Sequence, residues 1–217
     1  IYSQEKNTFS SFEKNVLDKQ TIPKGYISTL LTDSKGDIWI GTPQGLHKYV
    51  RNERQFRKYI LDKIDTLQAQ TNNITSIIEL ENNIWVSTRN GLFLYERVSE
   101  KFSRFNLESF NSINSISKDN KGFIWLGTTN GLVRFNPADS KVLHLSEILK
   151  DPLLKTHIGA MMIDASGVIW ACSYEYDLLK IANKPKVLSN SLIKDSLKLC
   201  SANTLSFTSD SKEDTWI

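Results

Sequence analysis

The chain of 217 residues contains 27 Lys and Arg and 24 Asp and Glu, giving a formal net charge of +3 at pH 7, and 40% of its residues are apolar. This composition is ordinary for a soluble globular protein, and no apolar run approaches the roughly 20 residues that span a bilayer. Basic and acidic residues are interleaved, so there is no basic block to follow a phosphate backbone, and nucleic-acid binding is disfavoured.

A first complete repeat of short strands covers residues 27–60. Residues 27–32 favour β-structure and end in Asp33-Ser34-Lys35-Gly36, where Asp can bond the backbone ahead of it and Gly can take the positive φ of a turn. Residues 37–42 are apolar on consecutive positions, which is typical of a strand buried on both faces. A tight hairpin ending at Gly45 leads into two further strands. The repeat therefore predicts a four-stranded antiparallel sheet.

The second strand of this repeat carries a motif that recurs along the chain. The copies are Ile38-Trp39-Ile40-Gly41-Thr42 followed by Gly45-Leu46, Ile84-Trp85-Val86-Ser87-Thr88 followed by Gly91-Leu92, Ile124-Trp125-Leu126-Gly127-Thr128 followed by Gly131-Leu132, the looser Ile169-Trp170-Ala171-Cys172-Ser173, and Thr215-Trp216-Ile217 at the end. All five tryptophans belong to this series, at intervals of 40 to 46 residues. Such a period is the signature of a repeat architecture whose units stack into one body.

Aromatic and apolar residues mark the third and fourth strands with a second regular spacing. Tyr49 is followed seven positions later by Phe56 and ten positions later by Tyr59. The same spacing is kept by Tyr95, Phe102 and Phe105, by Phe135, Val142 and Leu145, and at the start of the chain by Tyr2, Phe9 and Phe12. Four short strands in roughly 45 residues, without helical periodicity, describe the blade of a β-propeller.

We therefore predict an all-β fold, a β-propeller built of four-stranded antiparallel blades, with residues 1–217 as a single partial domain. Because residue 1 falls inside a repeat, we expect the natural N-terminus to lie upstream and the chain to be a fragment of a larger propeller. The alternative is that the terminal half-blades close into one shared blade of a five-bladed ring. The predicted blades are 1–12 (half), 27–60, 74–105, 113–145, 158–190 and 203–217 (half).

The tryptophans have a structural interpretation and a functional one. A ring of this size on a central strand would fill the space between neighbouring blades and bury on the order of 150–250 Å². An exposed ring would instead offer a platform for stacking sugars. Because every copy carries the ring at one register, we favour the packing role. The structural set is Trp39, Trp85, Trp125, Trp170 and Trp216.

The two cysteines, Cys172 and Cys200, do not form a metal-type spacing. Cys172 occupies the position of Gly41, Ser87 and Gly127 in the other copies, which is a place for a small buried residue. We therefore expect Cys172 to be a small core side chain, and we favour this over a disulfide with Cys200.

Together these motifs resemble the two-component-regulator propeller repeat. Its pattern is a D-x-x-G turn, then (I/L)-W-(I/V/L)-G-T, x-x-G-L and an aromatic residue two or three positions on. Three copies in this chain match closely, with turns at 33–36 and 119–122 among them, and the fourth copy is looser. The tryptophan is never followed by Asp, which distinguishes the series from WD-type repeats of the same period.

The resemblance implies a place in the extracytoplasmic sensor region of hybrid histidine kinases from Bacteroides-like gut bacteria. In that family, propellers of about seven blades precede an immunoglobulin-like domain, a membrane helix, and cytoplasmic kinase and regulator modules, and the ligands are oligosaccharides. It therefore implies a periplasmic location in an inner-membrane receptor, with no cofactor and no enzyme activity in this chain. The implied partners are an oligosaccharide, the remaining blades and the downstream domains, with a homodimer as one candidate assembly.

Motifs for catalysis or metal binding are not found in the sequence. The Asp-rich turns lack the oxygen ladder and the bidentate Glu of a calcium loop. His47, His144 and His157 have no i,i+4 or Cys partner. Nucleophile elbows, phosphate-binding glycine loops and paired-carboxylate motifs do not occur. A lyase-type propeller is a remote alternative, and its catalytic set would have to come from His157 with Glu147 or Glu175.

Ligand binding is better supported, and the architecture says where to look. Loops between strands two and three, and between strand four and the next strand one, should gather at one end of the propeller. In the fourth copy this hairpin reads Ser173-Tyr174-Glu175-Tyr176-Asp177, with rings for stacking on a sugar and carboxylates for its hydroxyls. Arg89, in the second-copy hairpin, could meet a uronate or sulfate. The candidate ligand-binding residues are Tyr174, Glu175, Tyr176, Asp177, Arg89 and His157.

Each candidate also has a plain alternative. The fourth hairpin could reflect simple repeat decay, and Arg89 could be solvated. The inter-blade connections at 60–73, 106–112, 146–157 and 189–203 are longer, and long loops on a rigid scaffold often carry recognition. Residues 145–154 could form a short helix over this face or a partner contact. We predict an oligosaccharide-sensing propeller, and the alternative is a non-catalytic scaffold for protein–protein contact or receptor dimerisation.

Overall fold

The computed structural model describes residues 2–3, 7–9, 26–61, 72–105, 107, 112–149, 155–175, 177–181, 208–209 and 215–216. Three complete antiparallel sheets of four strands follow one another along the chain, each with its strands side by side in sequence order. Blade one consists of β3 (Thr29–Thr32), β4 (Ile38–Thr42), β5 (Gly45–Val50) and β6 (Gln55–Tyr59). Blade two consists of β7 (Ile74–Leu80), β8 (Asn83–Thr88), β9 (Gly91–Glu96) and β10 (Lys101–Phe105).

Blade three has the same order, followed by a short helix. It consists of β11 (Ile113–Lys118), β12 (Ile124–Thr128), β13 (Gly131–Phe135) and β14 (Val142–His144), and α1 (Leu145–Leu149) follows directly. Blade four has three described strands, β15 (Ile158–Ile163), β16 (Ile169–Ser173) and β17 (Asp177–Ile181). The fourth strand expected within 182–190 lies outside the described residues.

Two strand pairs complete the description at the ends of the chain. β1 (Tyr2–Ser3) pairs with β2 (Thr8–Phe9), and β18 (Thr208–Ser209) pairs with β19 (Thr215–Trp216). The described residues place these pairs in two separate sheets. The alternative in which they close into one shared blade is therefore not seen in the described strands.

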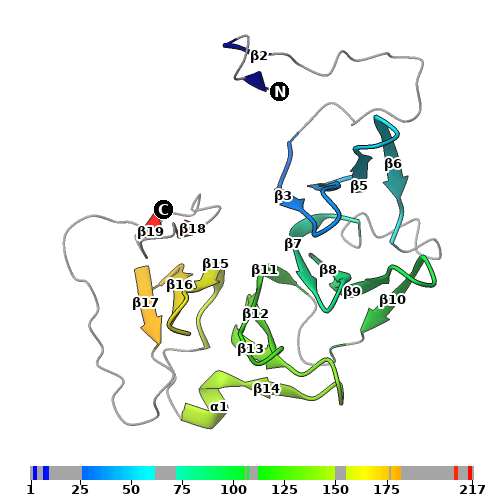
Figure 1. Cartoon of the computed structure of the whole chain (residues 1–217). Coiled ribbons are helices and arrows are strands. Elements are labelled where there is room, and N and C mark those ends of the chain that lie inside the picture. The colour runs from blue at the N-terminus through cyan, green and yellow to red at the C-terminus, as the bar shows by residue number, and fades with distance from the viewer. Residues whose placement is uncertain are drawn as a thin grey trace.

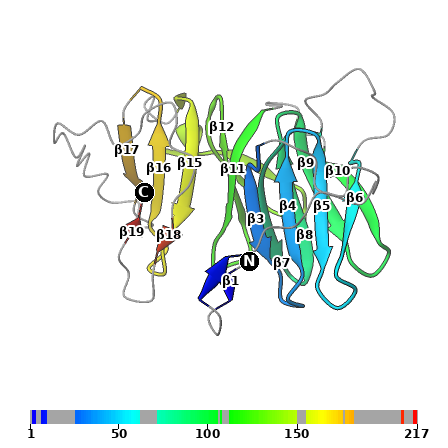
Figure 2. The same cartoon turned by 90° about the horizontal axis from the view of Figure 1, so that it is seen from above.

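The sheets are arranged in an arc with their first strands innermost (Figure 1). The first strands β3, β7, β11 and β15 contact one another in sequence, and Figure 2 shows them standing side by side. The later strands of each sheet lie progressively further out. The fold is thus the predicted β-propeller of four-stranded antiparallel blades, in partial form.

The register explains the regular aromatic spacing. Tyr49 lies directly opposite Phe56, as do Tyr95 and Phe102 in blade two. Tyr2 and Phe9 are paired in the same way at the start of the chain. A separation of seven positions therefore reflects a hairpin in which the two residues face each other across neighbouring strands.

The core lies between blades, and the tryptophans belong to it. Trp39 is fully buried in a cluster that includes Ile77 and Tyr95 of blade two, with its ring centroid 5.2 Å from that of Tyr95. Trp85 packs against Phe135 of blade three at 5.7 Å. Trp125 is buried with blade-four residues, Trp170 is half-buried, and the side chain of Trp216 lies outside the described residues. Each buried ring fills the space between its own blade and the next.

The turns between strands one and two hold the tryptophans through an aspartate. In blade one, Asp33 Oδ1 accepts the backbone N–H groups of Lys35 and Asp37, while Oδ2 accepts the Trp39 indole N–H at 2.8 Å. Asp119 and Asp164 bond Trp125 and Trp170 in the same way. The Asp that shapes the turn therefore also satisfies the polar atom of a mostly apolar ring.

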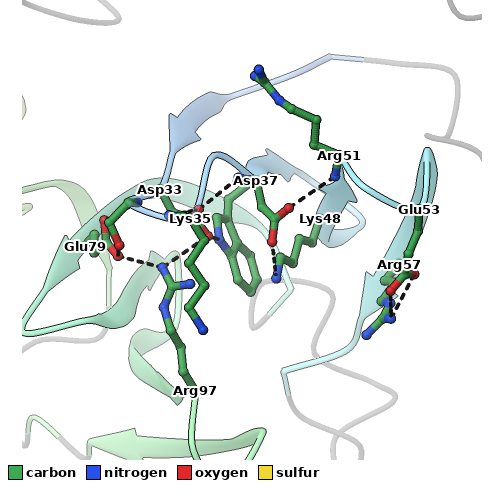
Figure 3. A network of polar contacts seen from close by, with 11 residues as sticks. Asp33, Lys35, Asp37, Lys48, Arg51, Glu53, Arg57, Glu79 and Arg97 are labelled. Carbon is green, nitrogen blue, oxygen red and sulfur yellow. Dashed lines mark hydrogen bonds and ion pairs between the residues drawn. The ribbon is translucent and has the colours of Figure 1, made fainter.

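Blade two lacks this aspartate and contributes an arginine instead. Its turn passes through Glu81 and Asn82, both at positive φ. Arg97, which is almost fully buried, reaches across to Asp33 of blade one at 3.1 Å and to Glu79 of its own blade at 2.6 Å (Figure 3). Glu79 also accepts the Ser34 hydroxyl at 2.6 Å. A charged network thus joins the first two blades at the end of the propeller where these turns lie, which we call the turn end.

The small-residue position in the second strand is tightly enclosed. A Cβ placed on Gly41 would lie 2.6 Å from Ile74 Cγ2 of the next blade. Cys172, in the fourth copy, is buried as expected, but it is disulfide-bonded. The preference for a free core thiol is therefore wrong, since a residue can be both small and cross-linked. The other cysteine of the chain, Cys200, lies outside the described residues.

Candidate functional site

The hairpins between strands two and three lie at the opposite end of the propeller, which we call the hairpin end. In the first three blades a threonine closes the hairpin. The Thr42 hydroxyl donates to the Gly45 carbonyl at 2.9 Å, and Thr88 donates to Gly91 at 3.1 Å. Gly45 has a φ of 134°, a conformation that side chains rarely adopt. These hairpins are minimal and leave little room for variation.

The fourth hairpin departs from this pattern for a local reason. Ser173 replaces the threonine and shares a hydrogen bond of 2.7 Å with the Thr156 hydroxyl, while its Oγ accepts the Glu175 backbone N–H. Asp177 occupies the glycine position, opposite Ser173 in the register. The result is a longer turn whose Tyr174 side chain is 66% exposed, which makes its ring available for contact.

A row of polar side chains crosses the hairpin end from blade two to blade four. Arg89 Nη1 donates to Asn114 Oδ1 at 2.9 Å, and Asn114 Nδ2 lies 3.0 Å from His157 Nε2. The His157 ring is 5.8 Å from the Tyr174 ring, with an angle of 36° between their planes. We call Arg89, Asn114, His157 and Tyr174 the polar row. It brings together three residues that the sequence proposed separately.

The remaining candidates lie beside the row or outside the description. Glu175 is exposed next to Tyr174, and Asp177 begins β17, with a side chain outside the described residues. Tyr176 also lies outside them. The structure therefore describes the side chains of four members of the predicted set, and it links Arg89, His157 and Tyr174 through Asn114.

Asn114 is the member of the row that sequence reasoning missed. It sits at a bulge in β11, where the register shifts between Ile113 and Ser115. Its Nδ2 also donates to the Ile158 carbonyl of blade four at 2.8 Å. Thr75 donates in the same way to the Ile113 carbonyl of the following blade. A polar residue near the start of each of the first three inner strands was a signal in the sequence, but its partner lies about 40 residues away.

The hydrogen bonds that Thr75 and Asn114 make to the following blade belong to a series along the inner strands, which we call the belt. Ser28 donates to the Ile74 carbonyl at 2.6 Å, which joins blade one to blade two. The bulge of β15 falls at Gly159, between Ile158 and Ala160, and Gly159 has no side chain to continue the belt. The belt therefore positions Asn114 from both sides and ends where the fourth blade begins.

His157 is held in a form that accepts a hydrogen bond. Burial lowers the pKa of His157 below 6.5, and the positive charge of Arg89 lowers this pKa further. A neutral ring can accept from the Asn114 amide through Nε2, whereas an imidazolium cannot. The row is therefore organised around a neutral histidine beside a charged arginine.

A cavity adjoins the row along the inner strands. Its volume is about 500 Å³, and polar side chains of three first strands line it, among them Ser28, Thr75 and Asn114. Its apolar lining includes Met161 and Met162 of blade four. Asn114 belongs both to this cavity and to the row, so a ligand on the row would have hydroxyl-lined space beside it.

The surroundings of His157 bear on the metal and lyase alternatives. No group of three His, Cys, Asp or Glu side chains in the described part of the chain could hold a metal ion. His157 has no hydrogen bond or ion pair to Glu147 or Glu175 among the described contacts. Its contacts are with an amide and an aromatic ring, an arrangement that suits binding.

Comparisons with known proteins agree with this architecture. A family model described as the two-component regulator propeller matches residues 21–44 and 108–130. The extracellular domain of a hybrid two-component system from B. thetaiotaomicron has a TM-score of 0.76 at 19% identity, covering 99% of this chain and 28% of that one. The extracellular domain of a one-component system from the same bacterium has a TM-score of 0.66 at 22% identity, covering 90% and 27%.

Virginiamycin B lyase from Staphylococcus aureus has a TM-score of 0.66 at 14% identity, covering 89% of this chain and 64% of that one. No curated protein sequence matches significantly. The molecule is thus a β-propeller, and its chain carries two-component-regulator propeller repeats. It spans about a quarter of the length of the Bacteroides extracellular domains. Its described residues contain no helix that is long and apolar enough to cross a membrane.

Proposed function

We propose that this chain is part of the extracytoplasmic sensor propeller of a hybrid two-component histidine kinase, and that it recognises an oligosaccharide at its hairpin end. The observation that carries the proposal is the polar row, because Arg89, His157 and Tyr174 come from three separate segments and meet through Asn114. An exposed ring beside polar donors is the arrangement that a sugar requires.

The location and the signalling role have separate support. The similar solved domains are extracellular parts of signalling systems. A disulfide at Cys172 is typical of a protein outside the reducing cytoplasm, so we place the chain in the periplasm as part of an inner-membrane receptor. This chain has no catalytic role in the proposal. A ligand would act by binding one receptor state more tightly than the other.

The experiment is calorimetry on the complete extracytoplasmic region against a panel of polysaccharide digests. We expect heat from at least one digest and a loss of about tenfold or more in affinity for Tyr174→Ala, because stacking on the exposed ring would be lost. Val98→Ala is the control, since Val98 is 97% exposed in the β9–β10 turn at the other end. A stable self-dimer that binds none of the digests would instead support the scaffolding alternative.

A further inference from the structure

We infer that the polar row binds an acidic saccharide, with a carboxylate or sulfate of one sugar residue on Arg89 and a neighbouring ring on Tyr174. This inference rests on the proposed function, because it names the chemical class of the ligand for the same site. Four observations support it. Arg89 has no carboxylate partner among the described residues, and its guanidinium is held in place by Asn114. Other charged side chains lie near it, and the Tyr174 ring lies at the far end of the row.

Arg89 is an exposed cation whose charge no described carboxylate neutralises. The ion pairs among the described residues involve Lys48, Arg57, Arg97 and Lys141 and leave Arg89 out. A guanidinium has five N–H donors in a planar fork that matches a carboxylate or sulfate. The neutral amide of Asn114 takes up one nitrogen, Nη1. The positive charge thus remains available to a ligand.

The guanidinium is also held in one place. Asn114 accepts from Arg89 through Oδ1, while its own Nδ2 is directed to His157 and to the Ile158 carbonyl. The Arg89 backbone N–H donates to the Asn73 carbonyl at 3.1 Å, so the hairpin itself is tied to the residue that precedes β7. A donor that is already ordered loses less conformational entropy when it binds an anion.

Two further basic side chains accompany Arg89 on its side of the row. Arg104 donates to the Asn90 carbonyl in the same hairpin as Arg89, and Lys58 lies opposite His47 near the hairpin of blade one. At the other end of the row, Glu175 lies exposed next to Tyr174, and exposed Lys155 precedes Thr156, whose hydroxyl bonds Ser173. An anionic group is therefore attracted to the Arg89 side, while sugar hydroxyls can donate to the carboxylate near the ring.

His157 and Tyr174 complete the site on the side away from the arginine. The two rings form a surface inclined at 36°, with Tyr174 the more exposed. Burial and the charge of Arg89 both lower the pKa of His157, in keeping with a guanidinium that lacks an anionic neighbour. A sugar ring on Tyr174 would place its substituents toward His157 and Asn114, which have polar atoms to meet them.

The test uses the complete extracytoplasmic region and matched ligands. Binding is measured by calorimetry for oligogalacturonides, for the same oligosaccharides after reduction of their carboxyl groups, for a sulfated galactan oligosaccharide and for polyglutamate. Two variants, Arg89→Gln and Arg51→Gln, are compared with the unchanged protein. Arg51 lies in the exposed β5–β6 turn at the turn end, and its side chain points away from the network in Figure 3.

We expect the uronate or the sulfated ligand to bind, and the carboxyl-reduced ligand to bind at least tenfold more weakly than the uronate. Arg89→Gln should weaken binding of the acidic ligand by about 10- to 100-fold, the range for a hydrogen bond to a charged group, and Arg51→Gln should leave it unchanged. Which of the two acidic ligands binds distinguishes a carboxylate from a sulfate.

Three results would overturn the inference. Equal affinity for the acidic and carboxyl-reduced ligands, with Tyr174→Ala still weakening both, would leave the proposed function standing and remove the anion from it. Polyglutamate binding as tightly as the best saccharide would mean that the site recognises negative charge and does not require a sugar. Failure of every saccharide would remove the proposed function as well.

Discussion

At the turn end of the propeller, polar side chains are buried and paired, whereas at the hairpin end they are exposed and joined in an open row. Asp33 is 4% exposed and is bonded to its own turn, to Trp39 and to Arg97. Arg89, at the other end, is exposed and has an amide as its partner. Both ends use an arginine to cross between blades. The difference is that one arginine meets two carboxylates and the other meets none among the described residues. The first belongs to the scaffold, and the second is the proposed ligand contact.

The largest expected effect is at the turn end. Asp33→Ala would leave the buried Arg97 with Glu79 alone and would release the Trp39 indole and two backbone donors. We expect a loss of about 3–5 kcal/mol in the free energy of unfolding, the cost of breaking a buried charge pair. Urea denaturation measures it. Asp119→Ala is the matched control, because Asp119 keeps the turn and tryptophan bonds and has no ion pair with an arginine among the described residues, and it should cost less. Equal losses would show that Arg97 adds nothing.

A second prediction concerns the core between the ends. His47 lies opposite Ile40 in blade one, where the other blades carry Phe93, Val133 and Leu179 at the same register. Burial, aided by the charge of Lys58, lowers its pKa from 6.5 to about 4. Between these values the unfolded chain binds a proton that the folded chain does not, so stability present above pH 6.5 is lost as the pH falls toward 4.

His47→Phe should remove this acid sensitivity. Relative to its own stability at pH 7, the unchanged protein should lose roughly 3 kcal/mol more than the variant by pH 4. Denaturation at a series of pH values measures the difference between the two curves. Parallel curves between pH 7 and pH 4 would mean that His47 titrates normally in the folded protein.

A smaller effect separates two glycines near the hairpin end. A Cβ on Gly127 would meet Ser115 Oγ and would lie 2.8 Å from Ile158 Cγ2, whereas a Cβ on Gly159 would have no neighbour within 4 Å. Gly127→Ala should therefore destabilise the protein by about 1–3 kcal/mol through overpacking, and Gly159→Ala should change stability by less than about 0.5 kcal/mol. Thermal unfolding of the two variants provides the comparison. A large loss of stability for Gly159→Ala would show that neighbouring atoms do enclose this position.

The smallest predicted change is a titration at the polar row. Arg89→Gln should raise the pKa of His157, because one of the two causes that lower it is the positive charge of Arg89. The pKa should stay below that of a free histidine, since burial remains. Nitrogen-15 NMR of the imidazole follows it directly, and Arg51→Gln should leave it unmoved. An unchanged pKa in the Arg89 variant would show that the charge of Arg89 does not act on His157 in solution.

Much of the scaffold could be predicted from the sequence because its signals are local. The seven-residue spacing of Tyr49 and Phe56 is a hairpin pair, and the Asp33 turn and the Gly45 hairpin each involve neighbouring residues. The hydrogen bond from Trp39 to Asp33 spans six positions and unites two motifs that were interpreted separately. Because the motif recurs, the same short-range signals appear in each blade and predict the same structure.

The contacts between blades were harder to predict because each joins residues about 40 positions apart. Asn114 looked like an ordinary polar residue, and its role depends on a bulge and on His157 of the next blade. Blade two has no turn aspartate, and its Arg97 pairs with Asp33 of the preceding blade. The disulfide at Cys172 was disfavoured because a small-residue position in a repeat does not reveal a cross-link.

The sequence by itself determined the period, the strand order, the buried tryptophans and the end of the molecule where ligand recognition was expected. These follow from backbone geometry and from apolar residues repeated at fixed positions, which any copy of the motif displays. The tertiary structure decided which polar residues of different blades meet. Arg89, Asn114, His157 and Tyr174 form one row because the first strands and the hairpins of successive blades are packed side by side. Their proximity depends on that packing and cannot be seen in any single repeat.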